Sequence, residues 1–286
     1  MFSIKDLHVF YGKFCALKIQ GEIKFGKNDF VGVIGSNGAG KSTMIKACLN
    51  LIPYKGEIKF DIPDCKIAVH MQDNEYLETV SVASVLKGLL GVKPGKDEKL
   101  DNLIDFFNFK KCLHKKYKNL SGGQKQRLTL IMVLYSDSPI TLFDEVTTGL
   151  DFETRQQLMD KIKSWYKHKE STVLLVTHYY DELENLANKL LILDNGRVVD
   201  YGKVDDLFKK YVGHCAIVVS NINKDDINNF HMIKAPDNKV AFRCDNIDEE
   251  KKICEYLIKN QLNFERTDKN IELIHLNALA SLEMSE

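Results

Sequence analysis

A glycine-rich run at residues 35–43 ends in a lysine followed by two hydroxyl residues. It fits the pattern G-x-x-x-x-G-K-[ST], in which glycines let the backbone wrap a phosphate and consecutive N–H groups face the anion. Lys41 would reach the β- and γ-phosphates of a nucleotide, and the Ser42 hydroxyl would ligate Mg²⁺. The candidate phosphate-binding residues are Gly35, Ser36, Asn37, Gly38, Ala39, Gly40, Lys41, Ser42 and Thr43.

The segments on either side of this loop supply the context that it needs. Residues 30–34 form a short apolar run typical of a buried strand, and residues 43–49 have helical spacing. A helix that begins in the loop would direct its N-terminal N–H groups at the anion. The alternative is a glycine-rich turn without a ligand, and the two flanks argue against it.

A second candidate anion site lies at residues 120–124, the pentapeptide Leu-Ser-Gly-Gly-Gln, directly before another helical segment. Ser121 can cap that helix, and Gly122 and Gly123 let backbone amides approach an anion at its N-terminus. Together with Gln124, these residues are candidates for binding a second phosphate group, far along the chain from the first loop.

Two apolar runs end in residues that could carry out hydrolysis. The run at 140–143 is followed by Asp144, which suits a Mg²⁺ contact, and by Glu145, which suits a general base that polarises water. The run at 173–177 is followed by His178, whose imidazole could hydrogen-bond a γ-phosphate. A lone histidine is more often structural. For Asp144 and Glu145 the alternative is a strand end capped by solvated acids, and the presence of a phosphate loop in the same chain argues against it.

Tyr11 and Gln72 are weaker candidates on local grounds. Tyr11 ends an early strand beside Gly12, where its ring could stack on an adenine or could be an ordinary half-buried strand tyrosine. Gln72 follows the strand-like residues 66–70, and its amide oxygen could contact Mg²⁺ or the attacking water. A surface polar role is the alternative for Gln72.

Composition excludes some classes of function. Lys+Arg and Asp+Glu balance at 40 each, so no global charge indicates a nucleic-acid partner. Seven cysteines without a C-x-x-C motif, and no secretory segment at the start, predict free thiols in a reducing cytosol. No apolar run approaches the about 18 residues needed to span a bilayer, so any membrane part must come from another chain.

The spacing of apolar residues predicts the secondary structure and the domains of the chain. Short apolar pieces punctuated by glycine predict antiparallel hairpins before residue 30, and residues 79–118 have a helical pattern. Residues 213–286 predict a small α+β appendage that carries no catalytic motif. Its predicted strands are 216–219, 239–243 and 271–275, and its predicted helices are 225–230 and 248–262. The predicted domains are 1–212, with a helical subdomain at about 73–135, and 213–286.

With these motifs in hand, the chain resembles the nucleotide-binding subunit of ATP-binding-cassette (ABC) transporters over roughly residues 1–210. The resemblance implies an α/β P-loop NTPase core with an antiparallel β subdomain and a helical signature subdomain, followed here by the α+β appendage. The matching positions are the Walker A loop at 35–43, the Q-loop Gln72, the signature at 120–124, the Walker B Asp144, the catalytic Glu145, the D-loop Asp151, the switch His178 and the adenine-stacking Tyr11. The sequence departs from the family pattern at Val146, where proline is usual, and at Thr141 within the Walker B strand.

The resemblance also implies a mechanism and partners. Two cassettes, as a homodimer or a heterodimer, would close head to tail on ATP and Mg²⁺. Lys41 of one chain would then face Ser121 to Gly123 of the other. The cassette would be an ATPase on the cytoplasmic face of the membrane, held there by a permease on a separate chain, with no nucleic acid bound. We expect residues 73–119 to carry the groove for that permease, and the alternative is that the apolar residues of this region belong only to the core.

The kind of transporter is less well defined. Residues 279–283 are similar to the ending of many cassettes that serve ABC-2-type exporters. The leading expectation is therefore export of a drug, a peptide or another amphipathic substrate. The alternatives are an importer ATPase and a soluble ABC ATPase without a transport role.

Overall fold

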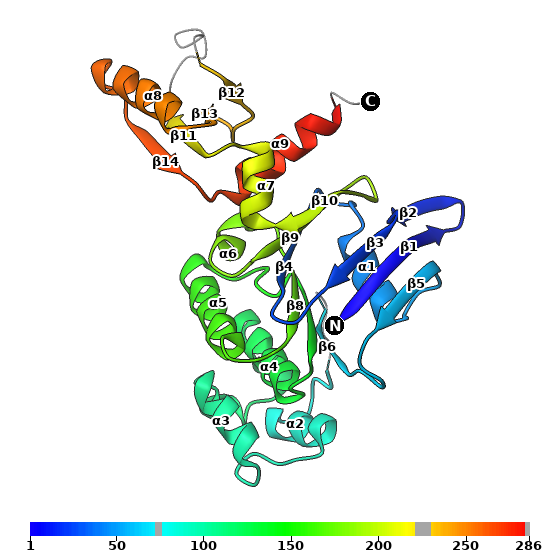
Figure 1. Cartoon of the computed structure of the whole chain (residues 1–286). Helices are drawn as coiled ribbons and strands as arrows, with labels where there is room; N and C mark the ends of the chain where they lie inside the picture. The colour runs from blue at the N-terminus through cyan, green and yellow to red at the C-terminus, as the bar shows by residue number, and fades with distance from the viewer. Residues whose placement is uncertain (72–75, 221–229, 284–286) are drawn as a thin grey trace.

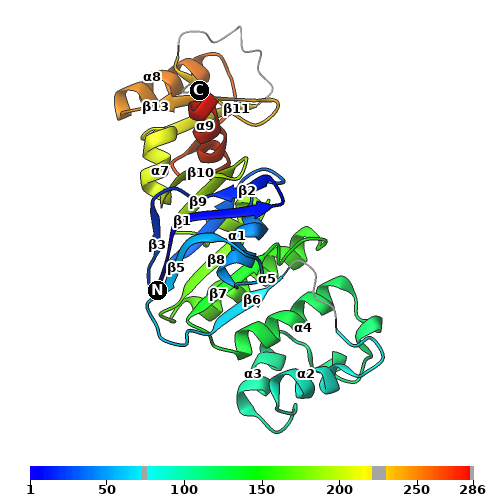
Figure 2. The same cartoon turned by 90° about the vertical axis from the view of Figure 1, so that its right-hand side faces the viewer.

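The computed structural model describes residues 1–71, 76–220 and 230–283. Gln72 and all but the last residue of the helix predicted at 225–230 lie outside these residues. In both views a large sheet occupies the middle of the molecule, with a helical region at one end and a smaller sheet at the other (Figures 1 and 2).

The larger sheet has ten strands within the described residues. Its order is β3-β1-β2-β10-β9-β4-β8-β7-β6, and β5 pairs with β1. The strands are β1 (Phe2–Tyr11), β2 (Phe14–Lys18), β3 (Glu22–Phe25), β4 (Phe30–Ile34), β5 (Lys55–Phe60), β6 (Ile67–His70), β7 (Ile140–Asp144), β8 (Thr172–Val176), β9 (Lys189–Asp194) and β10 (Arg197–Lys203).

Strands β9, β4, β8, β7 and β6 run parallel to one another, whereas β1 pairs antiparallel with β2, β3 and β5. In a parallel sheet all carboxyl ends meet at one edge, which is where ligands bind in open α/β sheets. The segments that follow β4, β7 and β8 therefore meet at one edge, and these segments begin at Gly35, Glu145 and Thr177.

Successive side chains of β8 enter two different cores. Val173 and Leu175 pack in one hydrophobic cluster, and Leu174 and Val176 pack in the other. A strand covered on both faces is apolar throughout, which explains the unbroken run in the sequence. The cluster around Val173 contains the helices α2 (Val82–Leu90), α3 (Glu98–Phe106), α4 (Gly122–Tyr135) and α5 (Phe152–Tyr166), and the other cluster contains α1 (Lys41–Cys48).

The predicted helical pattern at residues 79–118 corresponds to α2, α3 and the short 3-10 turns Lys110–Cys112 and Tyr117–Asn119. Ser81 caps α2 and Asp97 caps α3, each by accepting a backbone N–H three residues on. Across residues 1–71, 76–220 and 230–283, none of the helices combines the length and the apolar character that crossing a bilayer requires.

The smaller sheet has four antiparallel strands within the described residues, in the order β12-β13-β11-β14. Its predicted strands at 216–219 and 239–243 and its predicted helix at 248–262 are present. The elements are β11 (Cys215–Ser220), β12 (Met232–Ile233), β13 (Lys239–Cys244), α8 (Ile247–Lys259) and β14 (Phe264–Thr267). Helix α7 (Val204–Tyr211) lies between the two sheets, and α6 (Tyr180–Glu184) lies beside β9, next to α5 (Figure 1).

The strand predicted at residues 271–275 is wrong, because these residues begin the helix α9 (Ile271–Glu283). Asn270 supports its first turn by accepting a hydrogen bond from Leu273 N at 2.7 Å. Residues 271–275 alone, Ile-Glu-Leu-Ile-His, are too few to distinguish a short apolar strand from the start of a helix. The longer spacing of Ile271, Ile274 and Ala278, all buried, is helical.

Helix α9 packs on α6, α7 and β10 (Figure 1) and also contacts the part of the chain that carries the smaller sheet, because Asn277 exchanges two hydrogen bonds of 2.9 Å with the backbone of Lys234. Ile271, Leu273, Ile274 and Ala278 join the hydrophobic cluster of α4 and α5. Ala216, Val218 and Ala241 of the smaller sheet belong to the same cluster. The division after residue 212 therefore stays a prediction, because one hydrophobic cluster extends across it.

Replacing Ile274 with alanine is expected to lower the free energy of unfolding by about 2–5 kcal/mol, because it opens a cavity in the larger core. Urea denaturation followed by circular dichroism measures this change. The matched control is Ile258→Ala on α8, where the isoleucine is 65% exposed. Equal stability of the two variants would contradict the packing of α9 on the larger core.

Candidate nucleotide-binding and hydrolysis site

The loop between β4 and α1 depends on glycine at two positions. Gly35 has φ +152°, and a Cβ on it would lie 2.1 Å from the carbonyl oxygen of Leu193 in β9. Gly40 has φ +99° immediately before α1, and a Cβ there would lie 3.0 Å from the carbonyl oxygen of Ala16. The loop thus passes so close to neighbouring backbone that side chains are excluded, which leaves its own backbone free to face a ligand.

Lys41 lies beneath this loop with 6% of its surface exposed. Its Nζ donates to the carbonyl oxygens of Gly35, at 2.7 Å, and Ser36, at 3.0 Å. Burial lowers the pKa of the Lys41 ammonium, and the nearby carboxylates of Glu145 and Asp144 oppose that shift. The predicted phosphate-binding lysine therefore lies near the predicted metal-binding and catalytic acids.

Asp144 ends β7 and is almost fully buried. Burial raises the pKa of its carboxyl group, against the lowering effect of a hydrogen bond from Ser42. Its Oδ1 has no hydrogen-bond partner among the described residues. A buried carboxylate oxygen that lacks a donor, beside a serine hydroxyl, fits a hard cation such as Mg²⁺.

The described residues contain no group of three or more His, Cys, Asp and Glu residues that could hold a metal by themselves.

Glu145 and His178 are in direct contact. Glu145 Oε1 lies 2.9 Å from His178 Nε2, and its Oε2 accepts a hydrogen bond from Thr148 Oγ1 at 3.1 Å. The Glu145 backbone has φ +50°, in the left-handed region, and its N–H donates to Val176 O at 3.0 Å. The sequence indicated both residues but not this contact, which follows from the pairing of β7 with β8.

The pentapeptide at 120–124 starts α4 with the predicted serine cap. Ser121 Oγ accepts from Gln124 N at 3.3 Å, and Gln124 Oε1 accepts from Ser121 N at 3.2 Å. A Cβ on Gly123 would lie 3.4 Å from Leu150, so this helix end packs against the start of α5. Asp151 caps α5 by accepting from Thr154 N at 2.9 Å. The candidate second phosphate site and Asp151 are therefore neighbours.

The remaining predicted site residues are less constrained. Tyr11 lies at the end of β1 with 49% of its surface exposed, and Gln72 lies outside the described residues.

The sequence analysis does not predict a buried group that is formed by Thr147, Thr177 and Glu182, near the Glu145–His178 contact. No local motif identifies these three residues, because only the fold brings them together.

The parallel sheet with a glycine loop between its strand β4 and helix α1 defines a P-loop nucleotide-binding protein. Solved structures share this fold. One titled "Structure of ATP binding subunit of ABC transporter" has a TM-score of 0.64 at 24% identity, covering 73% of this chain and 92% of that chain. The structure of cbiO1 from Clostridium perfringens has a TM-score of 0.61 at 23% identity, and the match covers 73% of this chain and 90% of that chain.

Relatives define the family more narrowly. The sequence model for "ABC transporter" matches residues 20–148. The protein EcfA1 of Mycoplasmopsis pulmonis, an energy-coupling factor transporter ATP-binding protein, is 32% identical over 198 residues, which cover 63% of this chain and 74% of that protein. This chain therefore belongs to the ABC transporter family, as one of its ATP-binding cassettes.

Two other relatives carry names that describe import. The methionine import ATP-binding protein MetN of Lactobacillus acidophilus is 29% identical over 229 residues, covering 69% of this chain and 65% of MetN. The phosphonates import ATP-binding protein PhnC 2 of Nostoc sp. is 31% identical over 208 residues, which cover 65% of this chain and 85% of PhnC 2. The chain thus spans somewhat less than two thirds of the length of MetN.

Proposed function

We propose that this chain is the ATP-hydrolysing subunit of an import transporter and that it powers a permease on a separate chain at the cytoplasmic face of the membrane. The observation that carries the ATPase part is the contact between Glu145 and His178 near Lys41 and Asp144. The relatives named for import support the importer alternative. They do not support the expectation of an ABC-2-type exporter.

The proposed roles follow from the positions of the described groups and, for Gln72, from the resemblance to the family alone. Lys41 and the N–H groups of residues 35–43 bind the phosphates of ATP, and Tyr11 stacks on the adenine. Ser42 and Asp144, with Gln72, would hold Mg²⁺, which would supply positive charge to offset that of the phosphates. Glu145 draws a proton from the attacking water, and His178 keeps the Glu145 carboxylate oriented through the 2.9 Å contact.

A second cassette is part of this proposal. Ser121, Gly122, Gly123 and Gln124 form a capped helix end next to Asp151. We propose that this end binds the γ-phosphate of an ATP held by the P-loop of another cassette. The monomer is then inactive, and a monodisperse monomer that hydrolyses ATP at full rate would contradict the proposal.

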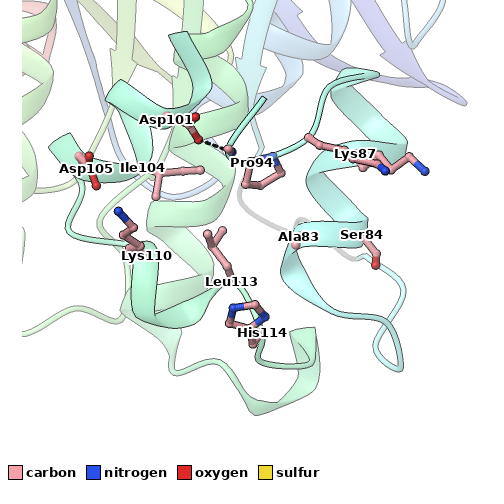
Figure 3. Close-up of a pocket in the computed structure, with 12 residues that line it drawn as sticks. Ala83, Ser84, Lys87, Pro94, Asp101, Ile104, Asp105, Lys110, Leu113 and His114 are labelled. Atoms are coloured by element: carbon pink, nitrogen blue, oxygen red, sulfur yellow. Dashed lines mark hydrogen bonds between the residues drawn. The ribbon is translucent and has the colours of Figure 1, made fainter. Parts of the chain in front are cut away.

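The helical region contains a cavity of about 650 Å³. Figure 3 shows Ile104 and Leu113 between Asp105 and Lys110 on one side and Ala83 of α2 on the other. We propose that this region receives a cytoplasmic segment of the permease, because an apolar floor with charged edges suits an amphipathic helix.

The direction of transport can be tested after reconstitution with the permease that co-purifies from detergent-solubilised membranes. In liposomes with the cassette outside, external ATP and Mg²⁺ should drive release of substrate loaded in the lumen, because import moves substrate toward the cassette. Accumulation in the lumen would indicate export. Co-purification of ribosomes, DNA or an assembly scaffold in place of a membrane protein would overturn the transport proposal.

A further inference from the structure

A buried carboxylate lies behind the Glu145–His178 contact. Glu182 belongs to the short helix α6, and its side chain is 0% exposed. Its Oε1 accepts a hydrogen bond from Thr147 Oγ1 at 2.6 Å, and its Oε2 accepts one from Thr177 Oγ1 at 2.6 Å. Each carboxylate oxygen thus has its own hydroxyl donor.

The two donors lie on the two segments that carry the proposed hydrolytic residues. Thr147 is two residues after Glu145 in the segment that follows β7, and Thr177 immediately precedes His178 after β8. Both threonines are buried, with 1% and 3% of their surfaces exposed. Glu182 therefore joins these two segments through two buried hydrogen bonds.

Thr147, Glu182 and Thr177 form a hydrogen-bonded bridge, which also contacts a third element, helix α5. Arg155 on α5 forms an ion pair with Asp181 at 3.1 Å, and its Nε lies 3.7 Å from Glu182 Oε1. Its guanidinium group stacks on the Tyr179 ring at 3.8 Å from the centroid. Because Asp151 caps the same helix α5, the bridge also connects to the segment beside the signature residues.

Burying a carboxylate is costly unless its hydrogen bonds are made, and an apolar side chain of similar volume would fill this space without that cost. Burial raises the pKa of Glu182, while the two threonines and Arg155 lower it. The buried polar bridge is therefore better explained by a need to hold Thr147 and Thr177 in fixed positions than by stability alone.

We propose that Glu182 is a positioning residue, which fixes Thr147 and Thr177 relative to each other and thereby holds Glu145 in contact with His178. This inference rests on the proposed ATP hydrolysis for its effect on turnover, but the bridge itself is a property of the described residues. The P-loop connects β4 to α1, and Thr147, Thr177 and Glu182 all lie outside it. Loss of the bridge should therefore lower kcat and leave the KM for ATP nearly unchanged.

The test uses five variants of the full chain: Thr147→Val, Thr177→Val, the double variant Thr147→Val/Thr177→Val, Glu182→Ala and Glu182→Gln. The matched control is Thr172→Val, since Thr172 is also buried, lies at the opposite end of β8 and donates to Gly26 O at 2.7 Å. Steady-state ATPase activity over a range of ATP concentrations gives kcat and KM. Hydrogen–deuterium exchange reports on residues 145–150 and 177–180 without requiring turnover.

We expect kcat to fall about 10- to 100-fold in both threonine variants and in Glu182→Ala, because small displacements of reacting groups have effects of this size. Glu182→Gln should retain kcat within about threefold, since its amide oxygen can accept from one threonine and its NH₂ group can donate to the other. The Thr147→Val/Thr177→Val double variant should be no slower than either single variant, because residues of one network act as a unit. Thr172→Val should leave kcat unchanged.

Unchanged kcat in both threonine variants, an equal loss in Thr172→Val, or an equal loss in Glu182→Gln and Glu182→Ala would each overturn the proposal. Faster exchange in both segments of Glu182→Ala supports it, and unchanged exchange contradicts it. If the wild-type chain hydrolyses no ATP even with its permease, the proposed function fails, and the exchange measurement still decides whether the bridge orders the two segments.

Discussion

Replacing Glu145 with glutamine is expected to lower kcat for ATP hydrolysis by about 100- to 10,000-fold, the range that general-base catalysis contributes. Glutamine has nearly the same shape, and its amide oxygen can still accept from Thr148 or His178, but it cannot take a proton from the attacking water. Because the P-loop is untouched, ATP affinity should be retained. Steady-state ATPase activity and equilibrium binding of ATP measure the two effects separately.

The same variant should accumulate as a closed pair of cassettes in the presence of ATP, because ATP that is bound but not hydrolysed keeps the interface together. Size-exclusion chromatography with light scattering detects this change. The control is Glu170→Gln, whose exposed side chain pairs with Lys27 at the surface and should contribute little. Unchanged steady-state ATPase activity in Glu145→Gln would remove Glu145 from its proposed role.

Features encoded by local pattern could be predicted from the sequence. The segments 30–34, 140–144 and 172–176 are strands because parallel strands buried on both faces need unbroken apolar runs. The helix start at Ser121 was predictable because its capping partner, Gln124, lies three residues further on. Such signals span a few residues and do not depend on distant parts of the chain.

Features that depend on distant residues were not predictable in this way. The contact between Glu145 and His178 requires β7 and β8 to be neighbours in register, and Asp144 pairs with Val176 in that register. Glu182 looks like an ordinary polar residue of a short helix until the same register brings Thr147 and Thr177 to its carboxylate. The prediction of a strand at residues 271–275 is wrong because the helical spacing of α9 emerges only over a longer segment. That segment packs in the hydrophobic cluster that contains α4 and α5.

Replacing Lys41 with alanine is expected to weaken ATP binding by about 10- to 150-fold, because a hydrogen bond to a charged group contributes about 1.5–3 kcal/mol. The ammonium group lies under residues 35 and 36 and near two carboxylates, so its removal leaves negative charge beside the proposed phosphate site. Equilibrium binding of ATP with Mg²⁺ measures the change, and Lys27→Ala at the surface is the control.

Lys41→Ala and Glu145→Gln together separate binding from chemistry. If the P-loop binds ATP and Glu145 only activates water, the first variant loses affinity and the second loses turnover while still binding. A closed pair of cassettes should then form with ATP in Glu145→Gln but not in the double variant, because closure depends on ATP held by Lys41. The comparison uses an ATP concentration that fills the site of Glu145→Gln but not the weakened site of the double variant. Closure of the double variant at that concentration would mean that the two cassettes associate without nucleotide, and the proposed role of ATP in joining them would be wrong.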